Sequence, residues 1–398
     1  MRKRAPAFGR NTNQRDEDFQ QKTDGRAVRH RGDPAAAPDG REAGDRITLF
    51  CFLLTLLVIY VHALNLGTAA GRPIEPVGTA GAWFAAAEAV LSNLIGSVAV
   101  PGFFMISAYL FCRDLRPVYL RDGIHGLAAA IAGKWRRRIR SLLLPFLLWN
   151  AIYYLIYVLF RGAPLSLPVF LSAVLDYRYN PVFWYMQQLI LLTLLAPLCC
   201  LFAWNRYLRG LALFAALWLA VNYALLPMQF PFHIVNEDAF AYYLLGAMLG
   251  LDEQKTLERC GRRQAFALTA ISAVMAALAA GVLLCPKLWE VSAVPLTATV
   301  IFRLCTPLSL LYLLTLLRLP QHPLPAFMRI NFFVYAVHFL LVRGLNHMLF
   351  LIVPAQAEIL FVAYLLMPVF CFVICYFLSV ILRRELPSLY GLLTGGRY

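Results

Sequence analysis

Two histidines lie inside strongly apolar stretches, where a titratable side chain is unusual. His62 follows the apolar run 49–61, and His338 lies in the segment NFFVYAVHFLLVR, three residues after Tyr335 and therefore on the same helical face. Imidazole titrates near neutrality and can take a proton from a hydroxyl, so each histidine is a candidate catalytic base. Two structural alternatives stay open: an interfacial position near a helix end for His62, and a hydrogen bond between helices for His338.

A dense basic cluster is the third candidate for chemistry. Five basic residues occupy the seven positions 134–140 of the segment KWRRRIRSLLLPF, which is more than membrane orientation requires. Arginine forms strong charge-assisted bonds with phosphate, so Arg137, Arg138 and Arg140 are candidates for binding a phosphorylated cofactor. Anchoring to the headgroups of anionic lipids is the alternative.

Arg303 lies far from either end of an apolar segment. A charge there costs at least ~2.5 kcal/mol on insertion scales, so we expect it to face the interior of a helix bundle. We count Arg303 among the cofactor-binding candidates. The alternative is that it pairs with a polar neighbour or with carbonyl groups at a helix end.

These residues require apolar helices to position them, and the composition provides such helices. Of 398 residues, 61% are hydrophobic and 14% are charged, against roughly 25% charged in a soluble domain. Soluble, secreted and disordered classes are therefore excluded for the chain after residue 45. The sequence predicts an all-α, polytopic membrane bundle of about ten transmembrane helices. The predicted spans are 47–67, 88–112, 141–160, 183–202, 211–227, 239–252, 264–285, 294–317, 330–353 and 357–382.

The positions of the charges predict the orientation of this bundle. When residues 1–45 are placed inside, the inner loops hold twenty basic residues and the outer loops hold four. This bias predicts that both termini are cytoplasmic. It also accounts for most of the net charge of +15, so no nucleic-acid partner is expected. We expect a disordered cytoplasmic tail at 1–45, a transmembrane domain at 46–385 and a short cytoplasmic tail at 386–398.

Several catalytic signatures are missing from the sequence. It contains no glycine-rich phosphate loop, no HExxH, no Cys/His metal spacing and no GxSxG. Most of the nine cysteines lie in or beside apolar runs and are typical of packing residues. We therefore expect neither a metal nor a tightly bound cofactor.

The ordered blocks along the chain resemble those of the acyltransferase-3 family of bacterial integral-membrane O-acyltransferases. The resemblance covers about 46 to 382 and rests on six blocks. In chain order they are VIYVH, PGFFMISAYLF, RRRIRSLLLPFLLWN, NPVFWYMQQLILLTLLAP, AFAYYLLGAMLG and NFFVYAVHFLLV. Two positions depart from the family pattern: Cys51 stands where an arginine is common, eleven residues before His62, and Gln187 stands where a charge is common.

The resemblance implies transfer of an acyl group, commonly acetyl, from cytosolic acyl-CoA to a sugar hydroxyl of an envelope glycan, polysaccharide or glycolipid. It implies a multi-pass protein of the bacterial cytoplasmic membrane, with the acceptor often at the outer face. The family's histidines correspond to His62 and His338, and its basic-block arginines to Arg137 and Arg140, with Arg138 close by.

On the resulting hypothesis, the acyl-CoA phosphates bind at the basic cluster. His62 acts as general base or carries the acyl group. Four residues expected near the outer face are candidates for contacting the sugar: Trp184, Tyr185, Gln187 and Gln188. Two other functions remain as alternatives. One is a transporter or flippase whose path is lined by the intramembrane polar residues. The other is a membrane scaffold that binds partners through the tail at 1–45.

Overall fold

The computed structural model describes residues 40–66, 78–222, 237–252, 257, 259–291, 293–319, 322–352 and 356–397. Residues 1–39 lie outside the described residues, so most of the predicted tail at 1–45 cannot be compared with the structure. Its last positions belong to the first described helix. The described ranges contain helices and no β-strand, which confirms the all-α prediction.

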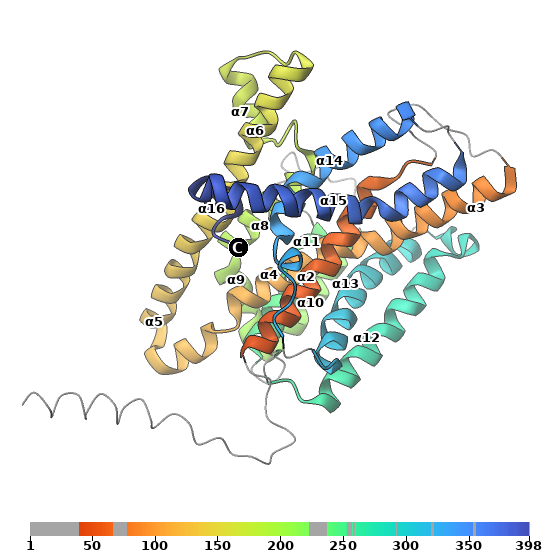
Figure 1. Ribbon diagram of the computed structural model, residues 1–398. Coiled ribbons are helices and arrows are strands. Elements are labelled where there is room, and N and C mark those ends of the chain that lie inside the picture. Colours follow the sequence, from red (N-terminus) through yellow and green to blue (C-terminus); the bar gives the residue numbers. More distant parts are fainter. Residues whose placement is uncertain are drawn as a thin grey trace, which may run out of the picture. The chain divides into compact units, whose positions relative to one another are not determined.

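The chain runs through fifteen described α-helices (Figure 1). They are α2 (Gly40–Ala63), α3 (Gly78–Ala89), α4 (Ala99–Cys112), α5 (Leu115–Arg138), α6 (Leu144–Arg161), α7 (Leu167–Leu175), α8 (Trp184–Leu194), α9 (Ala196–Trp204), α10 (Arg206–Asn222), α11 (Glu237–Leu251), α12 (Arg262–Leu283), α13 (Ala293–Leu316), α14 (Asn331–Ile352), α15 (Ala357–Glu385) and α16 (Pro387–Thr394). Two π-helical turns, η1 (Val90–Ile95) and η3 (Ile139–Leu143), precede α4 and α6, and the 3₁₀ turn η4 (Pro181–Phe183) precedes α8.

The prediction of a multi-pass membrane protein is confirmed, but the number of ten spans is not. In the described part of the chain, seven helical stretches are long and apolar enough to cross a membrane. An eighth arises if α8 and α9 with η4 are counted as one span, which bends by 59°. The bend lies just before Pro197, whose missing N–H interrupts the helical hydrogen-bond ladder. The expected spans at 211–227 and 239–252 are occupied by shorter apolar helices, Tyr207–Val221 and Asp238–Leu251.

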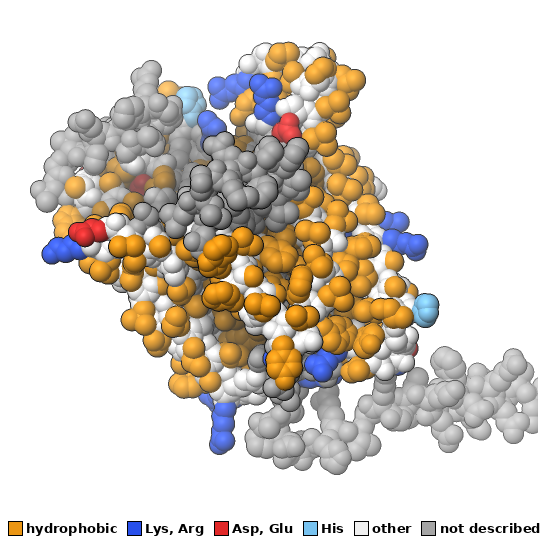
Figure 2. Space-filling view, turned by 180° about the vertical axis from the view of Figure 1, so that it is seen from behind, with side chains coloured by type: hydrophobic (Ala, Val, Ile, Leu, Met, Phe, Trp, Pro, Cys, Tyr) orange, Lys and Arg blue, Asp and Glu red, His pale blue; other side chains and the backbone are white. Residues whose placement is uncertain are grey.

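The exposed surface fits a lipid environment. Figure 2 shows a face on which hydrophobic side chains predominate and charged groups lie mainly toward the margins. Large apolar side chains are widely exposed, for example Phe160 at 77% and Leu278 at 64%. A soluble protein seldom exposes so much contiguous apolar area, whereas lipid tails cover it without cost.

α2 is the helix around which the candidate site is arranged. It packs against α4, α13, α14 and α15, which come from distant parts of the sequence. Phe50 and Leu54 of α2 are fully buried between them. Residues of α14, α15 and the segments before α4 therefore surround the two ends of α2.

α4 and α11 approach one another closely because glycine faces the contact. A Cβ added to Gly246 would overlap the backbone carbonyl of Met105, and one on Gly250 would lie 2.7 Å from the carbonyl oxygen of Tyr109. Two glycines four residues apart provide the flat helical face that lets helix backbones meet in a membrane.

α16 occupies the segment 386–398 that we expected to be a short cytoplasmic tail. It packs on α6, α14 and α15, and its residues Tyr390, Leu393 and Thr394 are buried. The indole Nε1 of Trp149 donates a hydrogen bond to the carbonyl of Leu393 at 3.0 Å. The described part of this segment therefore belongs to the folded bundle.

The α4–α11 contact predicts the effect of adding a single methyl group. Gly246→Ala is expected to destabilise the protein by about 1–3 kcal/mol because the two backbones must separate. The measurement is the melting temperature of the detergent-purified protein. Gly281→Ala is the matched control, because nothing lies within 4 Å of the added Cβ. Equal melting temperatures for the two variants would contradict the close backbone contact.

Candidate active site

The structure brings the two intramembrane histidines together. His62 lies in the last turn of α2 and His338 in the buried part of α14, and their ring centroids are 5.3 Å apart. Phe339 packs edge-on against His62 at 5.6 Å. His62 remains half-buried, whereas His338 has no exposed surface. His62 and His338 are 276 residues apart in the sequence, and this separation gave no indication that they lie together.

The hydrogen bonding of His338 defines which of its ring nitrogens carries the proton. Its Nδ1 lies 2.6 Å from the backbone carbonyl oxygen of Tyr335. A carbonyl only accepts hydrogen bonds, so we assign the proton to Nδ1 and a lone pair to Nε2. Among the described residues, no hydrogen-bond partner meets this buried Nε2. The nitrogen is therefore available to a proton or to a polar group of a ligand.

Tyr335 fixes the helix that carries His338. Its hydroxyl donates to the carbonyl of Val182 at 2.6 Å, and its ring stacks on Phe183 with centroids 5.6 Å apart. The hydroxyl of Tyr153 on α6 also donates to the carbonyl of Ala336 at 3.0 Å. α14 is thus tied to α6 and to the start of α8 within one turn of His338.

A buried carboxyl group, which we did not identify from the sequence, secures the chain after His62. Glu88 is fully buried, and its Oε2 accepts hydrogen bonds from the backbone N–H groups of Asn65 at 3.2 Å and Leu66 at 3.1 Å. The Asn65 side chain donates in turn to the carbonyl of Leu360 on α15 at 3.0 Å. The sequence does offer a signal for this role, namely an acidic residue in an apolar segment. Because Glu88 lies at the boundary of a predicted span, we did not single it out.

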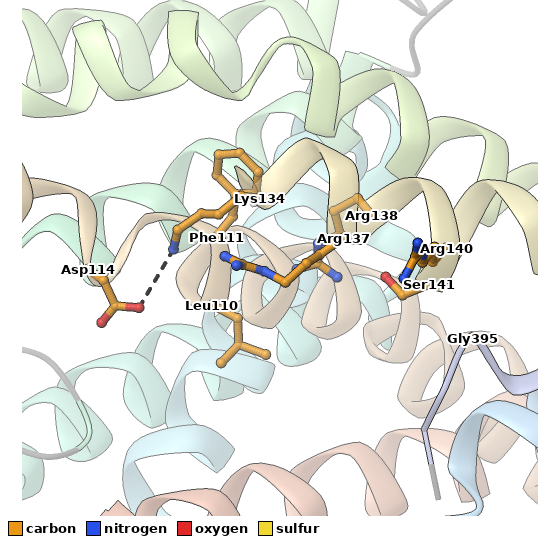
Figure 3. A pocket seen from close by; sticks show the side chains of 9 residues that line it. All are labelled: Leu110, Phe111, Asp114, Lys134, Arg137, Arg138, Arg140, Ser141 and Gly395. Carbon is orange, nitrogen blue, oxygen red and sulfur yellow. Dashed lines mark ion pairs between the residues drawn. The ribbon is translucent and has the colours of Figure 1, made fainter. Parts of the chain in front are cut away.

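The basic cluster lines a cavity of about 460 Å³ between α4, α5, η3 and the segment after α16. Figure 3 shows Asp114 and Lys134 at one end, and Arg140, Ser141 and Gly395 at the other. The complete lining is Leu110, Phe111, Asp114, Lys134, Arg137, Arg138, Arg140, Ser141 and Gly395. Three of the residues predicted to bind a phosphorylated cofactor therefore share one cavity.

The charge of this cavity is strongly positive. Lys134 Nζ lies 3.6 Å from the single carboxylate of the lining, that of Asp114. Within the described part of the chain, no carboxylate lies within ion-pair distance of the arginines Arg137, Arg138 and Arg140. Arg137 and Arg140 are exposed and Arg138 is half-buried. Such a group of uncompensated guanidinium ions suits a ligand that carries phosphate.

Arg303 does not belong to this cavity. Its guanidinium lies 3.6 Å from the carboxylate of Asp238, at the start of α11. The structure thus shows the alternative in which Arg303 pairs with a polar neighbour. It does not bring Arg303 together with the three arginines of the cavity.

The four candidates for sugar contact have different surroundings. Tyr185 is buried against Phe104, with ring centroids 4.9 Å apart, and against Tyr335 at 5.7 Å. Trp184 also packs against Phe104, at 6.5 Å. Gln188 is buried, whereas the Gln187 amide donates to the carbonyl of Leu175 at 3.0 Å. The four side chains therefore do not line one common surface. Tyr185 packs in the same part of the interior as Tyr335.

A row of aromatic rings leads from Tyr185 to the histidine pair. The Tyr185 ring contacts Tyr335, with centroids 5.7 Å apart. Tyr335 lies 5.9 Å from His338 between centroids, and His338 meets His62. The described residues thus hold a cationic cavity and, separately, a pair of buried or half-buried imidazoles.

Comparison with known families agrees with this geometry. The acyltransferase-3 family model, described as an acyltransferase domain, matches residues 47–384. The chain belongs to this family. No curated protein and no solved structure matches the chain. Membership confirms the resemblance that the ordered sequence blocks indicated, and it makes the helical bundle a membrane acyltransferase domain.

The carboxylate of Glu88 predicts a large effect of its removal. Glu88→Ala is expected to destabilise the protein by about 2–4 kcal/mol, because two buried N–H groups lose their acceptor. Glu88→Gln keeps an oxygen acceptor and is expected to cost less. Thermal unfolding of the purified protein measures both. Glu358→Ala, at an exposed position in the first turn of α15, is the control, and a melting temperature for Glu88→Ala equal to this control would refute the assigned role.

Proposed function

We propose that the protein is an O-acyltransferase of the bacterial cytoplasmic membrane. It moves an acyl group, commonly acetyl, from cytosolic acyl-CoA to a hydroxyl of an envelope glycan, polysaccharide or glycolipid. The observation that carries the proposal is that one helical bundle holds both an arginine-lined cavity and a pair of histidines, which ring contacts connect to Tyr185 through Tyr335. Family membership supports the acyl-transfer chemistry.

The donor binds first at the basic cavity. Arg137, Arg138 and Arg140 hold its phosphates by charge-assisted hydrogen bonds. The acyl end of the donor passes along Tyr185 and Tyr335 toward His62. We therefore assign Tyr185, with Trp184 beside it, to the donor's path. Arg303 has no part in the proposal because Asp238 neutralises its charge.

The acceptor hydroxyl reaches His62 in the last turn of α2. His62 takes the hydroxyl proton while the oxygen attacks the thioester carbonyl. The new ester C–O bond forms as the C–S bond breaks, and the thiolate leaves with a proton from the imidazolium of His62. Nε2 of His338, which has no hydrogen-bond partner among the described residues, offers an acceptor beside the ring of His62.

A second route gives His62 a covalent role. Its imidazole attacks the thioester, the thiolate leaves, and the acyl-imidazole then passes its acyl group to the acceptor. The two routes differ in one measurement: acid quenching of enzyme with radiolabelled acyl-CoA and no acceptor leaves label on the protein only if His62 carries the group.

The central role of His62 is tested by substitution. His62→Ala is expected to lower acyl transfer from radiolabelled acetyl-CoA by about 10²–10⁴-fold in purified, reconstituted protein, because the proton acceptor is lost. His347→Ala, an exposed histidine of α14, is the control. A folded His62→Ala protein with full transfer would exclude this mechanism. Transport of an unmodified solute without acyl turnover would instead favour a transporter.

The cavity predicts which arginine of the run contributes to donor binding. Arg137→Ala is expected to raise the KM for acyl-CoA about tenfold with little change in kcat, because a phosphate contact is lost. Arg136→Ala removes the same charge from the adjacent position, which lies outside the cavity lining, and is expected to leave KM nearly unchanged. Equal effects of the two variants would show that only the general positive charge matters, as in lipid anchoring.

A further inference from the structure

The segment after the last helix reaches into the bundle. α16 is fixed on both sides of its axis: Tyr390 packs on Phe333 with ring centroids 5.5 Å apart, and its hydroxyl accepts a hydrogen bond from Arg383 at 3.3 Å. The Trp149 indole binds the Leu393 carbonyl. The chain that follows therefore starts from a rigid position.

Two glycines turn this segment inward. Gly395 and Gly396 have φ of +63° and +74°, in the left-handed region that disfavours other residues. Their N–H groups close the end of α16 on the carbonyls of Leu392 and Gly391, at 3.3 and 2.8 Å. A Cβ on Gly395 would lie 2.6 Å from the Cα of Ser141. The turn thus lies directly against η3, at the edge of the basic cavity.

The turn delivers Arg397 to the interior. Its guanidinium lies 4.5 Å from the ring centroid of Phe332, and the side chain is half-buried. Gly395, two residues before Arg397, lines the basic cavity together with Arg138, whose guanidinium carries the same charge.

Arg397 has no carboxylate within ion-pair distance among the described residues. Burial, and next the positive charge of Arg138, lower the pKa of Arg397 to about 10. Two guanidinium groups brought together in a partly buried site repel one another, and a bound anion relieves that repulsion.

We propose that Arg397 is a donor-binding residue that, together with Arg138, holds a phosphate group of the acyl-CoA at the edge of the basic cavity where Gly395 lines it. This inference rests on the proposed acyl-CoA-dependent function. It assigns to the segment after α16 a direct part in the site, whereas sequence reasoning treated that segment as a tail.

The separation of the cations from His62 fits such a donor. The basic cavity, with Gly395 in its lining, holds the cations, whereas His62 lies in the last turn of α2 and does not line this cavity. A ligand that bridges the two must carry its negative charge at one end and its reactive group at the other end of a long arm. An acyl-CoA has this form, with phosphates and thioester separated by the pantetheine chain.

The test compares two donors in the full-length, reconstituted protein. Acetyl-CoA carries phosphates, whereas acetyl-pantetheine carries the same thioester and arm without them. Arg397→Ala is expected to raise the KM for acetyl-CoA by about 10- to 100-fold and to leave kcat/KM for acetyl-pantetheine within about twofold. Arg397→Lys keeps the charge and is expected to recover part of the loss. Arg384→Ala, whose side chain is 85% exposed, is the matched control.

Each outcome decides the proposal. An unchanged KM for acetyl-CoA in Arg397→Ala would overturn it, and so would an equal loss with both donors, which indicates a structural role. Gly395→Ala displaces the turn without removing the cation and is expected to raise the KM for acetyl-CoA selectively. If wild-type protein neither binds CoA in a calorimetric titration nor transfers acetyl from acetyl-CoA, the proposed function itself is wrong. If wild type is active and only the Arg397 results differ from expectation, only this inference is wrong.

Discussion

The hydrogen bond between His338 and the carbonyl of Tyr335 determines how the buried centre of the molecule can act. In a bundle surrounded by lipid, every buried polar group must find its partner within the protein. By engaging Nδ1, the Tyr335 carbonyl leaves Nε2 of His338 as the open acceptor. The position of that nitrogen depends on Tyr335 itself, whose hydroxyl and ring anchor α14 to the segment 182–183. The site is therefore preorganised by backbone contacts, which a change of ligand does not disturb.

The same constraint explains why the basic cavity and the histidine pair lie apart. Strongly charged groups are tolerated at the margin of the bundle, where the arginines line an open cavity. The histidine pair lies elsewhere in the bundle, with His62 in the last turn of α2. Aromatic rings suit this interior, because they bury apolar area and still present a polar edge or hydroxyl. Tyr185 and Tyr335 thus fill the interior beside the histidine pair without placing charge in the membrane.

Much of this organisation could be predicted from the residues, but the pairings could not. Apolar length identified the helices, and unusual polarity identified His62, His338 and the basic run. The contact between the two histidines depends on how α2 and α14 pack, and no local pattern contains that information. The number of ten spans is not confirmed, because two of the expected spans are occupied by apolar helices that are shorter than a full crossing, and composition does not record where a helix ends. Glu88 was missed because it accepts hydrogen bonds from two backbone N–H groups. Almost any residue type supplies such a donor, so the sequence does not show which residues pair with Glu88. α16 was missed because eight residues are too few for a periodic pattern, and it is stabilised by tertiary contacts.

Arg303 and Arg397 show why residue type alone does not assign a role within an apolar environment. Both are arginines whose charge is partly removed from water. Arg303 has the carboxylate of Asp238 at 3.6 Å, so its charge is balanced within the fold and the pair can serve packing and orientation. Arg397 has no such carboxylate among the described residues, and its guanidinium lies 4.5 Å from the ring centroid of Phe332. A partly buried cation without a counter-ion costs folding energy, and the fold supplies a two-glycine turn to place it there. The difference in charge balance, which appears only when distant helices are assembled, separates an arginine that stabilises the bundle from one that is positioned to meet an anion.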